Sequence, residues 1–187
     1  MSLYEKVDSV LVQGANVGVH AWNWTTGRTR ADLGNILDAG GSAFLNLSLY
    51  NSNKTIGLVA FPFLALGSYF NIKKNNEQDE LEVKAAKDGL SDIRVEVRKG
   101  HHKVFGTTYG AIAAAGGVAS VSHSGLIMIN LANTALALNC YVMRASYLPP
   151  RKNCLVRGLD HLSEALSELN TVPVPVPVRV YQGEKIK

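Results

Sequence analysis

Two adjacent histidines are the first residues in this sequence whose chemistry could carry a function. His101 and His102 lie between Lys99 and Lys103, a grouping that could bind a metal ion or a phosphate. We expect this stretch to be extended, and neighbouring side chains on a strand point to opposite faces, which argues against a bidentate site. We assign no metal to the other three histidines, His20, His123 and His161. The sequence therefore predicts neither a metal nor a cofactor.

Nucleophilic catalysis has few candidate residues. Ser122-His123-Ser124 offers hydroxyl groups beside an imidazole, but neighbours in sequence seldom reach triad geometry, and no GxSxG motif is present. Cys140 and Cys154 are not spaced as a CxxC or zinc-binding pair, so we expect two free thiols. We therefore predict that the protein is not an enzyme.

Glycine-rich stretches do not match a phosphate-binding loop. Residues 14–18 depart from GxGxxG, and nothing matches GxxxxGK[ST]. Gly40-Gly41 and Gly116-Gly117 are predicted instead to end helices or to allow tight packing.

The net charge of +4 and the pI near 9.1 are compatible with an anionic partner. Two basic pairs are the candidate contacts for anions or nucleic acid: Lys73 with Lys74, and Arg151 with Lys152. No RNP, zinc-finger or helix-turn-helix pattern accompanies them, which favours solvated loops over a nucleic-acid interface.

The composition is that of a globular protein that is poor in charge. The chain has 187 residues, of which 47% are hydrophobic and 18% charged, enough for one domain or two small ones. Residues 1–8 carry charges where a signal peptide needs an apolar run. The default localisation is therefore the cytoplasm or a host cell, and the compartment is left unassigned.

Charged residues are nearly absent from two long segments. Residues 39–72 contain only Lys54, and residues 104–143 contain none. Such segments belong to a deep core, a subunit interface or a lipid-facing surface. Each has a polar break near its middle, so residues 31–72 and 104–146 are predicted to form hairpins. Nearly all Lys and Arg would then lie on one side, as the positive-inside rule requires of membrane hairpins.

Three matches in the same order indicate an internal duplication. Residues 34–43 match 110–119, residues 68–75 match 146–153, and residues 95–100 match 178–183. We therefore predict two repeats, residues 1–94 and 95–187.

Within a repeat, alternating and helical patterns follow one another. Residues 10–24 are expected to be extended, with alternation at 17–24, and residues 45–49, 56–61 and 93–97 also alternate as strands do. A short helix that Thr29 or Asp32 can cap and Gly40-Gly41 ends follows the first strand, and residues 77–90 have a helical pattern. The predicted class is α+β, with the order strand, helix, strand, strand, helix, strand. Membrane-embedded helical or β hairpins are the alternative. In the second repeat, residues 159–169 are predicted to form an amphipathic helix.

Residues 171–187 form a Val-Pro arm at the C-terminus. Its alternating valines present an apolar edge that a partner chain would cover: Val172, Val174, Val176, Val178 and Val180. Its prolines confine it to a sheet edge or an extended arm. The sequence thus favours a non-enzymatic structural or assembly subunit of a shell, virion or cellular complex, with itself and other subunits as partners. A membrane-inserted subunit or pore-forming protein using the two uncharged hairpins is the alternative.

Overall fold

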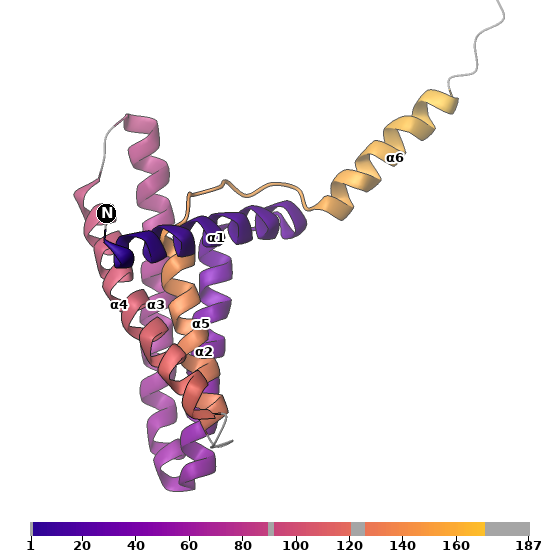
Figure 1. Ribbon diagram of the computed structural model, residues 1–187. Helices are drawn as coiled ribbons and strands as arrows, with labels where there is room; N and C mark the ends of the chain where they lie inside the picture. Colours follow the sequence, from indigo (N-terminus) through magenta and orange to yellow (C-terminus); the bar gives the residue numbers. More distant parts are fainter. Residues whose placement is uncertain (1, 90–91, 121–125, 171–187) are drawn as a thin grey trace, which may run out of the picture. The chain divides into compact units, whose positions relative to one another are not determined.

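The computed structural model describes residues 2–89, 92–120 and 126–170, which form six α-helices and no strand (Figure 1). The chain divides into two compact units, Met1–Cys154 and Leu155–Lys187. The helices are α1 (Leu3–Thr26), α2 (Arg30–Ser52), α3 (Lys54–Asp88), α4 (Ile93–Ser120), α5 (Ile127–Arg144) and α6 (Cys154–Asn170).

The first two helices begin and end at local sequence signals. Capping boxes start them, with the Ser2 and Thr29 hydroxyls accepting backbone N–H groups in the first turns of α1 and α2. Gly27 ends α1 in a left-handed conformation, with φ of 77°, which glycine adopts without strain.

Helices α2–α5 form two hairpins that pack side by side in the first unit (Figure 1). Helix α2 contacts α3 and α5, and α5 contacts α4, whereas α3 and α4 touch each other little. Helix α1 crosses this group and packs on α5 and α2. The two uncharged segments of the sequence are therefore the two helical hairpins.

The predicted α+β class is wrong, because the described segments that were expected to be strands are helical. Residues 17–24 lie in α1, 45–49 in α2, 56–61 in α3 and 93–97 in α4. The alternations that suggested strands span only five to eight residues. In α2 and α3, apolar side chains also lie on outward and inward faces alike. The apolar residues therefore do not recur with the 3.6-residue period that marks an amphipathic helix. Pro62, expected to end a strand, lies inside α3.

The paired glycines lie inside helices rather than at their ends, as Gly41 in α2 illustrates. A Cβ added to Gly41 would lie 2.9 Å from Leu136 Cγ and 3.2 Å from the Ala132 carbonyl oxygen of α5. Gly34, seven residues earlier, is similarly close to Asn139 and Met143 of α5. Glycine is thus needed where α2 and α5 pack closely.

Gly41→Ala is expected to destabilise the protein by about 1–3 kcal/mol, because the added methyl group overpacks the contact between α2 and α5. Gly40→Ala is the matched control, since a Cβ at Gly40 has nothing within 4 Å. The control is expected to be neutral or slightly stabilising, because alanine favours a helix over glycine. Chemical unfolding of both variants measures the difference, and equal stabilities would contradict the packing.

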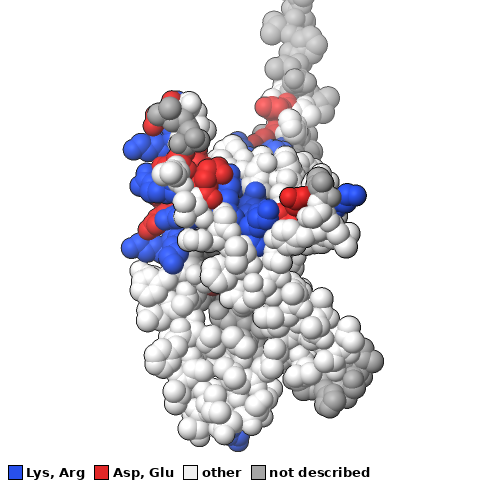
Figure 2. All heavy atoms as spheres, turned by 60° about the vertical axis from the view of Figure 1, so that its left-hand side comes forward, with Lys and Arg blue, Asp and Glu red and all other residues white. Residues whose placement is uncertain are grey.

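The first unit buries about as many polar side chains as apolar ones and exposes many large apolar side chains. Its fully buried side chains include Arg30, Asp38, Asn75 and Gln78, whereas Phe63 of α3 is 72% exposed. Charged groups gather over one half of the face in Figure 2, and the other half carries none apart from a basic group at its far tip. In the uncharged half, large apolar side chains such as Phe63 are exposed while Asp38 is buried. A water-soluble domain usually shows the opposite arrangement.

The described part of the second unit is helix α6. The predicted helix at residues 159–169 lies within it. One face is apolar and exposed, with Leu155, Leu159, Leu162 and Leu166 at helical spacing. The Val-Pro arm, residues 171–187, lies outside the described residues, and so do its five valines.

The proposed duplication into residues 1–94 and 95–187 stays a prediction. Its first matched pair, residues 34–43 and 110–119, lies in α2 and α4, the first helix of each hairpin. In the second matched pair, Tyr69 lies in α3 and Tyr147 follows α5. Val95 is helical, and its match Val178 is not described.

Candidate functional site

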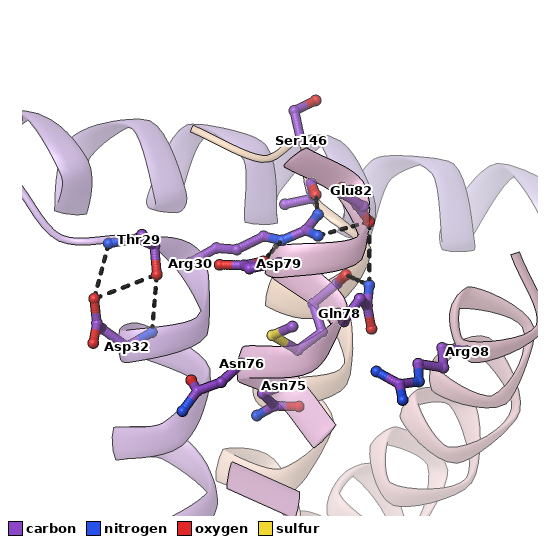
Figure 3. Close-up of polar contacts among 12 residues, drawn as sticks. Thr29, Arg30, Asp32, Asn75, Asn76, Gln78, Asp79, Glu82, Arg98 and Ser146 are labelled. Atoms are coloured by element: carbon purple, nitrogen blue, oxygen red, sulfur yellow. Dashed lines mark hydrogen bonds and ion pairs between the residues drawn. The ribbon is translucent and has the colours of Figure 1, made fainter. Parts of the chain in front are cut away.

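A buried arginine joins the ends of the two hairpins. Arg30 is wholly buried at the start of α2, and its Nε donates to Asp79 Oδ1 of α3 at 2.9 Å. Its Nη2 lies 2.7 Å from Glu82 Oε1, and its Nη1 donates to the Ala145 carbonyl oxygen at the end of α5 (Figure 3). Burial raises the pKa of Asp79, and the Arg30 charge opposes that shift. One guanidinium therefore ties together three helices.

Gln78, one residue before Asp79, connects α3 to both α5 and α4. Its Nε2 donates to the Met143 carbonyl oxygen at 2.9 Å, so its Oε1 is the acceptor for His102 Nε2 at 3.2 Å. His102 therefore carries its proton on Nε2. The prediction that His101 and His102 point to opposite faces came from a strand, but on α4 they also differ, because His101 is exposed and His102 is half-buried.

His102 is uncharged at neutral pH. Burial, followed by the nearby Arg30 charge, lowers the pKa of His102 to about 4, with smaller effects from His101, Arg98 and Arg144. The unfolded chain therefore binds a proton at this residue from about pH 6.5 downward, while the folded protein resists protonation until about pH 4. The stability that the folded protein has with His102 uncharged is therefore fully present above pH 6.5 and is lost as the pH falls toward 4.

We expect the folded protein to lose about 2 kcal/mol of stability from this residue between pH 8 and pH 5. His102→Gln should remove that part of the pH dependence, because glutamine can still donate to Gln78 but does not titrate. His101→Gln, on the exposed neighbour, should leave it intact. Unfolding at a series of pH values measures the slopes, and an unchanged slope in His102→Gln would refute the assignment.

A second polar cluster is centred on Asp38, two turns further along α2. The Asp38 carboxylate is 1% exposed and accepts three hydrogen bonds from neutral groups. Ser68 Oγ donates to Oδ2 at 2.7 Å, Asn71 Nδ2 donates to Oδ1 at 3.0 Å, and Asn139 Nδ2 donates to Oδ1 at 3.3 Å. No ion pair to Asp38 is present within the described residues. The cluster therefore holds a carboxyl group from α2 between amides of α3 and α5.

Asn75 extends this cluster toward the charged end. Its Nδ2 donates to Asn35 Oδ1 at 3.1 Å and to Asn139 Oδ1 at 3.4 Å. Asn35 in turn donates to Asn76 Oδ1 at 3.0 Å. Amide side chains of α2, α3 and α5 thus form a continuous chain of hydrogen bonds, which fixes how these helices pack.

A cavity of about 200 Å³ opens beside Asp38, between α2, α3, α4 and α5. Asp38, Asn71 and Asn139 line it together with Cys140 and Tyr109, and three basic side chains also contribute: Lys74, Arg98 and His101. Arg98 is held by Glu77 at 2.8 Å and donates to the Lys74 carbonyl oxygen. The cavity therefore contains one carboxyl group, several amides and cationic groups from the charged end.

The sequence-predicted basic pairs lie on different elements. Lys73 and Lys74 are exposed on α3, and Lys74 lines the cavity. Arg151 lies after α5, where its backbone N–H donates to the Gly27 carbonyl oxygen, and Lys152 follows it. Their role in binding anions or nucleic acid stays a prediction. Ser122-His123-Ser124 lies outside the described residues.

Comparison with known proteins adds no assignment to this site. The chain matches no family model, no curated protein and no solved structure. Within residues 2–89, 92–120 and 126–170, no group of three or more His, Cys, Asp or Glu side chains could hold a metal ion. The function is therefore inferred from the structure of the chain itself.

Sequence inspection missed the residues at the centre of both clusters. Asp38 and Asn139 are single polar residues between apolar ones, Arg30 is one of several polar residues at 28–32, and no local motif marks any of the three. A signal was nevertheless present, because Asp38 directly precedes the uncharged segment 39–72 and Asn139 lies inside the uncharged segment 104–143. A polar residue kept in such a segment is a candidate for a functional contact.

Proposed function

We propose that this chain is a non-enzymatic membrane subunit whose two helical hairpins, α2–α3 and α4–α5, cross the bilayer. The membrane-spanning parts are residues 33–52, 55–72, 104–120 and 126–143. The observation that carries the proposal is the exposed apolar surface of these four segments, while their polar residues Asp38, Ser48 and Asn139 are buried between the helices. In water such a surface would be strongly unfavourable, whereas lipid acyl chains would cover it.

Helix α3 provides the strongest support. Among the described helices, it is the one that is long and apolar enough to cross a membrane. Only 6% of its most apolar stretch is buried inside the protein. A helix that is apolar nearly all round is either a buried core helix or a membrane span. Large apolar side chains of α3 are exposed in many directions, including Leu58, Phe61, Phe63, Leu66 and Phe70. Lipid fits this helix better than a single protein partner, which would cover one face.

The dimensions and the charge distribution agree with a bilayer. Residues 55–72 form a helix about 27 Å long, close to the hydrocarbon thickness of about 30 Å. Lys54 is the only Lys or Arg in the four spans or the turn at 53–54. The basic residues that border the spans, Lys73, Lys103 and Arg144, lie at the other ends of the hairpins. This asymmetry is typical of membrane proteins, whose cytoplasmic ends carry the excess of Lys and Arg.

Helix packing in this unit also resembles that of membrane proteins. Glycines at close approaches, such as Gly34 and Gly41 against α5 and Gly106 against Cys140, let helix backbones come near. Between the helices, Asp38 and the asparagines form hydrogen bonds, which are a main source of helix association in lipid. The polar residues that lower the hydropathy of α2 and α5 thus lie on inner faces.

Within this proposal, the cavity beside Asp38 takes up water or a small polar solute from the charged side. An ionisable residue in a membrane span is costly and normally faces a cavity or a partner, as Asp38 does. Lys74 and His101 mark the end from which a polar molecule would enter.

Extraction from cell membranes tests the insertion of the hairpins. The expressed chain should stay in the membrane fraction after an alkaline carbonate wash and dissolve only with detergent. Release by carbonate would contradict insertion, because such a wash removes peripheral proteins. A variant with lysines in place of Phe63 and Leu66, at the middle of α3, should lose insertion, because a central lysine costs about 2.5–3.5 kcal/mol. Lysines in place of Glu80 and Ala86, exposed at the charged end of the same helix, are the matched control.

Assembly with further copies or subunits remains compatible with a membrane-inserted chain. The Val-Pro arm at 171–187 and pore formation by the hairpins both stay predictions.

A further inference from the structure

The outward face of α1 is apolar along the whole helix. Leu3, Val10, Val17 and Trp24 recur at intervals of seven residues, and each is more than half exposed. Seven residues are close to two helical turns, so these side chains form one stripe. Leu3, Val10 and Val17 are left uncovered by the described part of the first unit.

Buried contacts on the opposite face hold α1 in place. Asp8 is nearly enclosed, and its carboxylate oxygens accept from Arg144 Nη1 at 2.6 Å and Nη2 at 2.8 Å. This pairing lowers the pKa of Asp8, as expected for a stabilised carboxylate. At the other end, Asn23 Nδ2 donates to the Pro149 carbonyl oxygen at 2.9 Å. The orientation of α1 is thereby fixed, and the stripe points away from α5.

The two edges of α1 beside the stripe differ in polarity. On one edge, Tyr4, Val7 and Leu11 line an apolar groove of about 420 Å³ together with small residues of α4 and α5. On the other edge, the exposed residues are Lys6, Gln13 and His20. The apolar surface of α1 therefore continues onto the apolar surface of α4 and α5 on one side, and ends at polar residues on the other.

The contacts of α1 also give its depth relative to the uncharged segments. Asp8 meets Arg144 and Lys103, the first charged residues beyond the spans of α5 and α4. Lys103 Nζ lies 5.5 Å from the centre of the Tyr4 ring. Helix α1 thus lies where the uncharged half of the hairpins meets the charged half.

We propose that α1 is an interfacial helix that lies in the plane of the membrane surface and binds phospholipid. This inference rests on the proposed membrane insertion of the hairpins. The stripe and the groove contact acyl chains just below the headgroups, and the edge with Gln13 and His20 faces water. Lys6 and Lys103 lie near the lipid phosphates, and Tyr4 and Trp24 occupy the interfacial level that aromatic residues prefer.

A lipid surface fits α1 better than a second copy of the chain. Its apolar area covers two adjacent faces and is continuous with the surface of α4 and α5 that the hairpins present to lipid. A helix from a second copy would cover the stripe alone and leave the groove open.

Fluorescence quenching in lipid vesicles tests the inference. In a background with both tryptophans replaced by phenylalanine, single tryptophans are placed by Val10→Trp in the stripe and Gln13→Trp on the polar edge. Bromine atoms near the headgroup end of the acyl chains should quench Val10→Trp several-fold more than bromines near the chain ends. Aqueous iodide should instead quench Gln13→Trp several-fold more than Val10→Trp.

Phe63→Trp, at the middle of the α3 span, distinguishes failure of this inference from failure of the proposed function. If bromines near the chain ends quench Phe63→Trp but iodide quenches Val10→Trp as strongly as Gln13→Trp, α1 lies in water and the interfacial assignment is wrong. Protection of Val10→Trp from both iodide and bromolipids would assign the stripe to a protein partner and also overturn it. If no bromolipid quenches Phe63→Trp, the membrane proposal itself fails.

Discussion

Arg30→Met is expected to lower the free energy of unfolding by about 3–5 kcal/mol. The substitution keeps most of the buried volume but removes the charge that pairs with Asp79 and Glu82. These carboxylates are then left in a largely buried position, with Lys99 Nζ at 3.4 Å from Glu82 as the remaining nearby cation. The Ala145 carbonyl oxygen at the end of α5 also loses its donor.

Arg28→Met is the matched control for this experiment, because Arg28 lies two residues earlier on the exposed surface. Its effect should be within about 0.5 kcal/mol, as for most surface substitutions. Chemical unfolding in detergent micelles compares the two variants. Equal and small losses would mean that the network in Figure 3 does not hold the hairpins together.

Asp38→Leu is expected to destabilise the protein by about 3 kcal/mol or more. Leucine has a similar size but cannot accept hydrogen bonds, so the buried Asn139 and the less buried Ser68 and Asn71 would each lose an acceptor. Each buried donor left unpaired costs about 1–3 kcal/mol.

Asp38→Asn separates the loss of hydrogen bonds from the loss of shape. Asparagine keeps one acceptor oxygen, so its cost should be clearly smaller than that of leucine. Thermal and chemical unfolding in detergent measure both variants. If Asp38→Leu is as stable as the parent protein, the cluster around Asp38 does not organise α2, α3 and α5.

The location of the hairpins could be predicted from charge alone. Residues 39–72, with Lys54 as their only charge, lie within α2–α3, and their polar break coincides with the turn at Asn53. Residues 104–143 extend from α4 into α5, and most of their polar break, residues 121–125, lies outside the described residues. Absence of charge reports an apolar environment irrespective of secondary structure. Charge therefore located the segments, whereas the strands assigned within them are helices.

Secondary structure was misassigned because periodicity depends on a contrast between a polar outside and an apolar inside. In α2, Leu47 is exposed while Ser48 beside it is buried, which reverses that contrast. Leu45, Leu47 and Leu49 then alternate by chance and suggest a strand. Gly40-Gly41, a helix stop in water, instead lies where α2 approaches α5 closely. Both errors have the same origin in the reversed distribution of polar residues.

The candidate site could not be derived from the sequence, because its members lie far apart along the chain. Asp38 of α2 and Asn139 of α5 are 101 residues apart. The contact of His102 with Gln78 likewise depends on how α4 lies against α3. Only the packing of the helices brings such residues together.

Two adjacent residues of α4 give the most direct test of the membrane account. Thr108 is exposed, whereas Tyr109 is half-buried and lines the cavity beside Asp38. Each is replaced by cysteine in a background with Cys140→Ala and Cys154→Ser, and the reaction with a small water-soluble thiol reagent is followed in lipid vesicles. Because a thiol in hydrocarbon does not meet the reagent, Tyr109→Cys should react at least several-fold faster than Thr108→Cys. Faster labelling of Thr108→Cys, the result that exposure to water would give, would contradict the account.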